Sequence, residues 1–318
     1  MPRLHRLAGA ATAVLALGLL AAAPAAGQEP HVGDAHIVAH FALNAGQTPE
    51  NIALEADGSA DLTFAFARQV AHVAPDGGTR ILVTLPDVPN PANPLVHSAI
   101  VTGIARAHDG TLYVGYATGT RKTGIWRLVP GEAPEQITEL PPTGFPDGLA
   151  LDEHGGVLYA ADSVLGTIWR IPQQGGPATA WAKGAALDPL PEPARGFGAN
   201  GIKVRRDAVW VSNTDRGALL RVPVRADGTA GPIETRATGL DGIDDFAFPG
   251  TGTTVLAATS TTDALLLVRP NGRSTALLSG RNGLSNPTSV AVGGGTVYVT
   301  SAAYFTQRDP NLVLARLR

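Results

Sequence analysis

Asp147-Gly-Leu-Ala-Leu151 is a short apolar segment with a polar residue at its head, and it belongs to a longer pattern. A turn follows it, Glu153-His-Gly-Gly156, and then a segment typical of β-strands, Val157-Leu-Tyr-Ala-Ala161. Two such runs separated by a glycine-containing turn predict a β-hairpin. Further β-type runs near Ile168 and Thr179 continue the pattern. The unit that begins at Asp147 is therefore predicted to be a sheet of four antiparallel strands.

The same segment recurs along the chain, and this repetition indicates the fold. The copies begin at Glu50, Thr102, Asp147, Asn200, Asp244 and Thr288. Successive copies are 52, 45, 53, 44 and 44 residues apart, by subtraction of these numbers. Repeats of about 40 to 50 residues with four strands each are typical of β-propeller blades. The sequence predicts an all-β, six-bladed propeller; a pair of β-sandwiches is the alternative, and it would not explain six equal units.

The last repeat contains one strand fewer than the others. It offers β-type runs at 288–292, 296–300 and 312–317. We expect the missing strand to come from the N-terminal side, at His36–Leu43, which precedes the first repeat. Closing the ring in this way would remove the open sheet edges that a propeller must otherwise protect. Residues 28–318 are thus predicted to form a single propeller domain.

The first 27 residues are predicted to be a signal peptide. Arg3 and Arg6 precede an apolar run over 7–26, and Ala23 and Ala25 provide the small residues of a cleavage site. A retained N-terminal anchor is the alternative. No other segment is long and apolar enough to span a bilayer. We therefore expect a secreted or extracytoplasmic protein that makes no membrane contact after the signal is removed.

Composition excludes several classes of function. Of the 318 residues, 16% are charged and the net charge is -3, so no basic face predicts a nucleic-acid partner. The cysteine count is 0, which excludes disulfides, thiolate nucleophiles and cysteine metal sites. Gly196-Phe-Gly-Ala-Asn-Gly201 matches the spacing of a dinucleotide loop. Such a loop needs a strand before it and a helix after it, whereas proline-rich 187–193 precedes this one and β-type residues follow. We expect no nucleotide cofactor.

The heads of the six repeats predict a metal site. The first strand of each propeller blade lines the central channel, so the heads should form a ring at one mouth of it. Three are carboxylates and one is a carboxamide, and no lysine or arginine adjoins the acidic members in sequence. Oxygen ligands of this kind favour Ca²⁺ over zinc, with magnesium or manganese still possible. Thr102 and Thr288 are expected to line the channel and contact a substrate. The alternative is that Asp-Gly and Asn-Gly are ordinary turn residues.

Four of the repeat openings resemble a known family. Pro49-Glu-Asn-Ile52, Phe145-Pro-Asp-Gly-Leu149, Ala199-Asn-Gly-Ile202 and Ile243-Asp-Asp-Phe246 are similar to the blade openings of the senescence marker protein, gluconolactonase and luciferin-regenerating enzyme family. The resemblance runs from about Gln47 to Tyr298. It implies a six-bladed propeller with calcium or another divalent ion in its channel, an arrangement that paraoxonase-like enzymes share. Many members of the family hydrolyse lactones.

The resemblance also implies roles for single residues. Glu50, Asn200 and Asp244 match the metal ligands common to the family. Asp147 matches a position that is a ligand in some members, and Asp245 a flanking position that can add another. Asp244 is expected to act as general base as well as ligand.

Two functions follow from these observations. The first is a calcium-dependent hydrolase of small lactones or esters, in which the ion polarises the carbonyl group and water attacks it. The alternative is a binding module without catalytic activity, whose ion is structural.

Other polar residues near the repeat openings are less specific. Paraoxonase-like enzymes carry a histidine at the second-blade opening, where this chain has a threonine. His97 and His108 flank that opening, and we interpret them as solvated loop residues. Arg106, Lys203 and Arg195 are candidates to orient an anionic substrate, with surface exposure as the alternative. The insertion over 182–195 is either a lid or a connecting loop.

Overall fold

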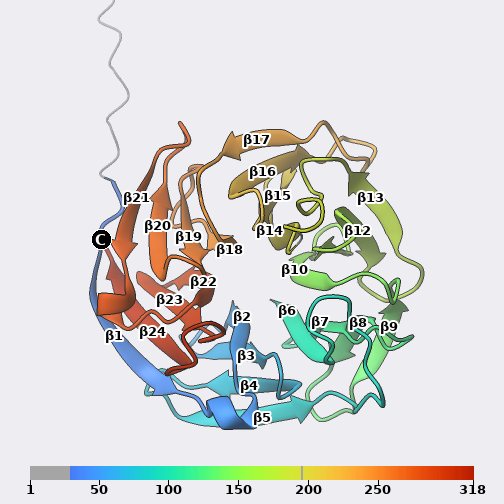
Figure 1. Cartoon of the computed structure of the whole chain (residues 1–318), viewed down its shortest axis with the longest axis horizontal. Coiled ribbons are helices and arrows are strands. Elements are labelled where there is room, and N and C mark those ends of the chain that lie inside the picture. The colour runs from blue at the N-terminus through green and yellow to red at the C-terminus, as the bar shows by residue number, and fades with distance from the viewer. Residues whose placement is uncertain (1–28, 195) are drawn as a thin grey trace, which may run out of the picture.

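The computed structural model describes residues 29–194 and 196–318, which form six four-stranded antiparallel sheets arranged in a ring (Figure 1). The predicted six-bladed propeller is confirmed. The predicted signal peptide lies outside the described residues. Within the described ranges, no helix is long and apolar enough to cross a membrane.

In each of the first five blades the strands follow the chain from the channel outward. Blades 1 and 2 consist of β2 (Pro49–Leu54), β3 (Ala60–Phe64), β4 (Gln69–Val73), β5 (Thr79–Thr84), β6 (Ile100–Arg106), β7 (Leu112–Ala117), β8 (Gly124–Leu128) and β9 (Glu135–Glu139). Blades 3 and 4 consist of β10 (Pro146–Asp152), β11 (Val157–Asp162), β12 (Thr167–Pro172), β13 (Thr179–Lys183), β14 (Ala199–Arg205), β15 (Ala208–Asn213), β16 (Ala218–Pro223) and β17 (Glu234–Ala237). Blade 5 consists of β18 (Ile243–Ala247), β19 (Val255–Thr259), β20 (Ala264–Val268) and β21 (Ser274–Leu278).

Blade 6 contains the two ends of the described chain. It consists of β22 (Pro287–Gly293), β23 (Thr296–Ser301), β24 (Asn311–Leu317) and β1 (Val32–His40), and β1 pairs antiparallel with β24. The expected closure by an N-terminal strand is confirmed, although the strand begins and ends earlier than 36–43. Two register shifts between β1 and β24 interrupt the alternation of side chains, so the pattern in the sequence hides the first residues of the strand. Two short 3-10 helices, η1 (Leu43–Ala45) and η2 (Gly280–Asn282), complete the elements.

The hydrophobic core lies between neighbouring blades. Ile168 of blade 3, for example, belongs to one buried cluster with Ile202 and Val211 of blade 4. Inner and middle strands are buried on both faces because each is covered by the blade before it and the blade after it. Burying such an aliphatic side chain contributes about 1.5 to 3 kcal/mol. The apolar alternation within each repeat therefore stabilises the ring as well as the single blade.

Each inner strand carries an irregularity at the head of its repeat, where its register with the second strand shifts. In β10 the shift lies between Pro146 and Leu149, around Asp147. A β-bulge of this kind takes its residues out of the ladder and re-aims their side chains. The fold therefore uses the same local distortion six times to present the repeat heads at one end of the channel.

The glycine that follows three of the heads allows neighbouring inner strands to approach each other. Gly103, Gly148 and Gly201 lie within strands, and none has a positive φ. A Cβ atom on Gly148 would lie 2.4 Å from the carbonyl oxygen of Asn200, and one on Gly201 would lie 2.5 Å from Cα of Asp245. The Asp-Gly and Asn-Gly pairs are thus close-packing positions. The structure excludes the turn alternative for them.

Hydroxyl groups join the inner strands around the ring. Thr102 donates a hydrogen bond to the carbonyl of Pro146 over 2.7 Å, and Thr288 donates one to the carbonyl of Pro49 over 2.8 Å. Both threonines have 0% of their surface exposed. This differs from the expectation that Thr102 and Thr288 contact a substrate, because their hydroxyls are engaged between blades.

Replacing Thr288 by valine should weaken the closure of the ring. The change keeps the shape of the side chain but leaves the buried carbonyl of Pro49 without its donor. We expect the free energy of unfolding to fall by about 1 to 3 kcal/mol, measured by urea denaturation. Thr84→Val, on the exposed edge of β5, is the control and should change it by less than about 0.5 kcal/mol. Equal effects of the two changes would show that this hydrogen bond does not stabilise the closure.

Candidate metal centre

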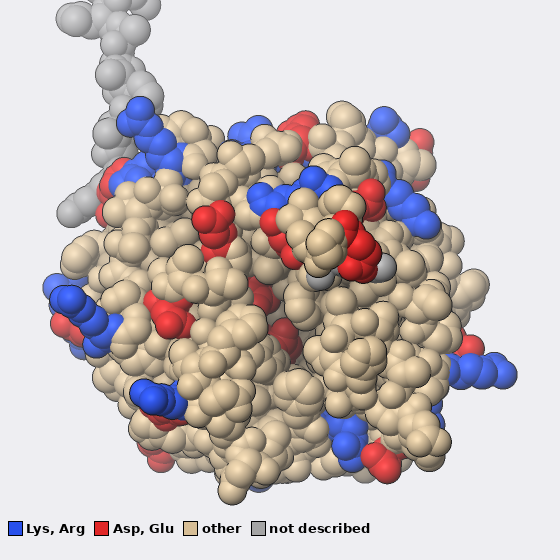
Figure 2. Space-filling model, in the orientation of Figure 1, with Lys and Arg blue, Asp and Glu red and all other residues tan. Residues whose placement is uncertain are grey.

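Four polar side chains converge from four blades at the mouth of the channel. Glu50, Asp147, Asn200 and Asp244 are each the second residue of an inner strand, namely β2, β10, β14 and β18. Asp147 and Asp244 are 3% and 8% exposed, and Glu50 is partly buried. Figure 2 shows acidic side chains at the bottom of a hollow in the centre of one face of the molecule, with uncharged surface around them. The structure thus brings these four repeat heads together at the channel mouth, as predicted.

Burial makes the charged state of these carboxylates unfavourable. It raises the pKa of Glu50 to about 7, and the nearby charge of Asp245 acts in the same direction. Burial also raises the pKa of Asp147 and of Asp244 well above the ordinary value, and the charge of Glu50 is the next cause for both. Buried carboxylates that repel one another either take up protons or require a cation.

The hydrogen-bond donors that contact these three carboxylates are all neutral. The hydroxyl of Tyr304 donates to Oε2 of Glu50. Ser163 Oγ donates to Oδ2 of Asp147 over 2.7 Å, and the side-chain amide of Asn200 lowers the pKa of Asp244 by hydrogen bonding to it. In the described part of the chain, no lysine or arginine forms an ion pair with any of the three. Their negative charge is therefore left without compensation.

The orientation of the Asn200 amide is set by its neighbours. Its Nδ2 donates to Oγ1 of Thr214 over 3.0 Å. Thr214 can only accept this bond, because its own hydrogen goes to the carbonyl of Ile243 over 2.7 Å. Oδ1 of Asn200 accepts no hydrogen bond from the described residues. The carbonyl oxygen of the Asn200 amide is thus free to bind a cation.

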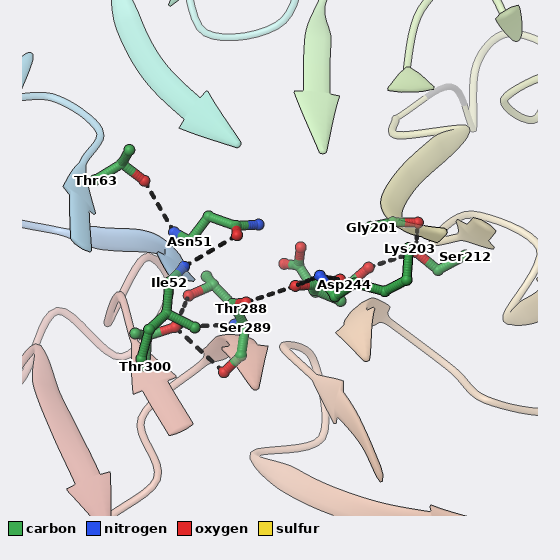
Figure 3. A network of polar contacts seen from close by, with 11 residues as sticks. Asn51, Ile52, Thr63, Gly201, Lys203, Ser212, Asp244, Thr288, Ser289 and Thr300 are labelled. Carbon is green, nitrogen blue, oxygen red and sulfur yellow. Dashed lines mark hydrogen bonds and ion pairs between the residues drawn. The ribbon is translucent and has the colours of Figure 1, made fainter. Parts of the chain in front are cut away.

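Asp245, the fifth predicted ligand, differs from the others because it has a cationic partner. Lys203 Nζ lies 2.7 and 2.6 Å from its two carboxylate oxygens, and Ser289 Oγ donates to it over 2.6 Å. Figure 3 labels these two partners, Lys203 from β14 and Ser289 from β22. Asp245 is 1% exposed. Lys203, a candidate to orient an anionic substrate, is thus engaged by Asp245. The two residues are 42 positions apart, so only the packing of β14 against β18 brings them together.

The spacing of the carboxylates limits which of them can share one ion. Among the described residues, ligand atoms from three acidic or histidine side chains lie within 4.8 Å of one another at a single place, and that place is not the ring. An ion at the mouth would therefore not contact three of these carboxylates as they stand. The set implied by the family resemblance, Glu50, Asn200 and Asp244, contains two carboxylates and one amide. It fits the donor chemistry and does not conflict with this spacing.

The close group lies at the opposite ends of the strands, in Glu55, Asp61 and His72. It adjoins a pocket of about 390 Å³ between blades 1 and 2. Arg106 also reaches this group, 3.3 Å from Glu55 and 3.6 Å from Asp61. Because a guanidinium group already compensates these carboxylates, we interpret the group as an ion-pair network. Arg106, a candidate to orient a substrate, lies here and not at the mouth.

The remaining residues singled out in the sequence lie outside the ring. His108 is fully accessible and contacts Glu153, and His97 is exposed on the connection before β6. The connection between β13 and β14 is held against blade 4. The carboxylate of Asp215 accepts hydrogen bonds from three of its backbone N–H groups, at Leu190, Gly196 and Phe197. This anchoring favours a connecting loop over a lid; Arg195 itself lies outside the described residues.

Tyr304 is the member of the site that the sequence did not reveal. It lies on the connection between β23 and β24, and 254 positions separate it from Glu50. No repeat aligns it with the other blades, because this connection is longer in blade 6. Closure of the ring is what places blade 6 beside blade 1.

Comparison with known proteins identifies the fold. No protein-family model matches the chain, and no curated protein matches it. Among solved structures, a gluconolactonase from Xanthomonas campestris is 16% identical, with a TM-score of 0.62 over 91% of this chain and 97% of that one. A calcium-binding regucalcin from Agrobacterium tumefaciens is 15% identical, with a TM-score of 0.62 over 85% and 90%. Virginiamycin B lyase from Staphylococcus aureus is 16% identical, with a TM-score of 0.55 over 91% and 100%. At these identities the likeness shows that the chain has the propeller fold of these proteins.

Proposed function

We propose that this protein hydrolyses lactone or ester bonds with a divalent ion, in the first place Ca²⁺, held at the mouth of its channel. The observation that carries the proposal is the group of buried carboxylates that have no cationic partner, together with the free amide oxygen of Asn200. Magnesium or manganese would meet the same oxygen ligands. The family resemblance of the blade openings and the fold shared with a gluconolactonase and a calcium-binding regucalcin support the same reading.

Each residue at the channel mouth has its own proposed role. Glu50, Asn200 and Asp244 would hold the ion, which when bound polarises a carbonyl group and stabilises negative charge on its oxygen. The hydroxyl of Tyr304 orients the carboxylate of Glu50. Asp244, whose carboxylate lies at the mouth, accepts the proton of the attacking water. Asp147, hydrogen-bonded to Ser163, adds negative charge nearby.

We further propose that the protein acts outside the cytoplasm. The basis is the basic N-terminus followed by the apolar run over 7–26 and the small residues at Ala23 and Ala25. Mass spectrometry of the protein from culture medium or periplasm would test it, with a mature chain that begins near residue 28 as the expected result. Recovery of the uncleaved chain in the membrane fraction would favour the retained anchor.

The purified protein should hydrolyse small lactones or aryl esters in the presence of calcium. We expect chelation to reduce kcat/KM by at least about 100-fold, because the ion supplies the main stabilisation of the developing oxyanion. Readdition of calcium should restore it. The measurement is a pH-stat assay over a panel of γ- and δ-lactones together with aryl acetates. Absence of turnover on every member of the panel would contradict the proposed activity.

A binding module is the second candidate. The propeller fold can present a binding surface without catalysis, and the ion then serves only to stabilise the ring. In that case calcium would raise the melting temperature but no substrate of the panel would be turned over.

A further inference from the structure

The mouth of the channel is bordered on one side by an apolar surface. We call the following six residues the collar: Phe66, Leu95, Val96, Leu165, Phe197 and Tyr304. Each lies on a connection at the mouth end of a blade, between β3 and β4, β5 and β6, β11 and β12, β13 and β14, or β23 and β24. They come from blades 6, 1 and 3 and from the connections that lead into blades 2 and 4.

The collar is a contiguous, packed unit. Five of its members pack against one buried cluster that contains Ile100 and Phe145, residues at the mouth end of the inner strands. The ring of Phe66 contacts that of Tyr304 edge to face, with centroids 6.0 Å apart. Phe197 meets Phe145 in the same manner at 5.6 Å. These contacts hold the aromatic rings in defined positions.

The collar adjoins the carboxylate group of Glu50 at the channel mouth and remains accessible to solvent. Tyr304 belongs to both, because its ring packs in the collar while its hydroxyl donates to Glu50. Phe66, whose ring contacts Tyr304, is 39% exposed. A ligand whose reacting group lies at Glu50 would therefore extend across apolar side chains.

Two cations on described mouth-end connections, Arg68 and Lys122, are directed away from the collar. Arg68, two residues after Phe66, pairs with Asp87 at 3.2 Å. Lys122 donates to the carbonyl of the same residue over 3.0 Å. The only hydroxyl in the collar is that of Tyr304, and it is engaged by Glu50. The collar thus offers little to the hydroxyl groups of a polar ligand.

We propose that the collar binds an alkyl substituent, so that the substrates are lactones or esters with a hydrocarbon chain and not polyhydroxylated sugar lactones. The inference rests on the proposed hydrolase function and specifies its substrate class. A sugar lactone would place several hydroxyls against side chains that cannot hydrogen-bond to them. An alkyl chain in the same place loses only its contact with water, which is favourable.

The experiment compares three δ-lactones of equal ring size: δ-valerolactone, δ-decalactone and δ-gluconolactone. Because the collar stays partly exposed, we expect about half the benefit of full burial, or about twofold in kcat/KM per methylene. The five additional carbons of δ-decalactone should then raise kcat/KM about thirtyfold over δ-valerolactone. δ-Gluconolactone should be the poorest substrate. Calorimetric binding of the same lactones in the presence of a chelator provides a readout independent of turnover.

Two phenylalanines at the mouth provide a matched pair of variants. Phe66→Ala removes an exposed collar ring and should reduce the preference for δ-decalactone about fivefold. Phe305→Ala removes a ring that is 69% exposed and has no aromatic contact among the described residues, so the preference should not change. Near-equal melting temperatures of both variants would show that the folds are intact.

The possible outcomes separate the two proposals. A preference for δ-decalactone that is reduced by Phe66→Ala but not by Phe305→Ala supports the collar inference. Turnover in which δ-gluconolactone is preferred overturns the collar inference and leaves the hydrolase function standing. If no lactone or aryl acetate is turned over but δ-decalactone binds and Phe66→Ala weakens its binding, the collar is an apolar ligand site and the proposed hydrolase function is wrong. Absence of both turnover and binding overturns both.

Discussion

Asp244→Asn abolishes calcium-dependent hydrolysis if the proposed site is correct, with an expected fall in kcat/KM of about 10³-fold or more. The substitution preserves the size of a side chain that is 8% exposed, so it changes charge and basicity with little effect on packing. Two functions are lost together, since Asp244 is proposed both to hold the ion and to accept the proton of water. Calcium affinity, measured by chelator competition, should fall in parallel.

Asp147→Asn is the matched control for this experiment. It removes one buried negative charge from the same ring, but Asp147 accepts a hydrogen bond from Ser163 and lies outside the set of Glu50, Asn200 and Asp244. We expect a decrease of no more than about tenfold, through the weaker electrostatic attraction for the ion. Turnover by Asp244→Asn within threefold of the parent protein would rule out its role. Loss of the stabilisation by calcium in a protein that turns over no substrate would indicate the binding module.

The metal-free protein should become less stable as pH rises from about 4.5 to 7. The pKa of Glu50 is raised from 4.5 to about 7 in the folded protein, so in this window the folded state holds a proton that the unfolded state has released. The stabilisation from Glu50 is fully present below its pKa in the unfolded state and is lost as pH rises through its pKa in the folded state. A difference of that size corresponds to about 3 kcal/mol in the free energy of unfolding.

Calcium should remove this pH dependence, because a bound cation favours the ionised carboxylate. The measurement is urea denaturation at several pH values, with chelator and with calcium. In chelator, Glu50→Gln should make the decline less steep, because the raised pKa values of Asp147 and Asp244 still contribute, whereas Glu132→Gln, at an exposed glutamate on a turn, should leave it unchanged. A metal-free protein whose stability does not change between pH 4.5 and 7 would show that Glu50 is not held in the environment described.

The part of the site that could be predicted consists of residues that recur at one position of the repeat. Glu50, Asp147, Asn200 and Asp244 recur at one position of the repeat, and a propeller places equivalent positions around one axis. Their convergence follows from the period alone. The same position is a bulge in every inner strand, which the sequence does not predict, because a bulge changes hydrogen-bond register and leaves no mark in composition.

The repeat pattern does not predict contacts between residues of different blades. The pairing of Lys203 with Asp245 and of Tyr304 with Glu50 joins residues that have no common position in the pattern. The same holds for the hydroxyl of Thr288, which the ring position suggested as a substrate contact and which instead closes blade 6 onto blade 1.

The sequence by itself determined the number of blades, the strands of each blade and the six residues that head them, because these depend on local apolar alternation repeated at one period. Only the tertiary structure decided which of those residues lack a cationic partner, which hydroxyls are engaged between blades and where the apolar collar meets the carboxylates. The physical reason is that charge compensation and desolvation depend on atoms a few ångströms away in space, and in a ring those atoms belong to other blades.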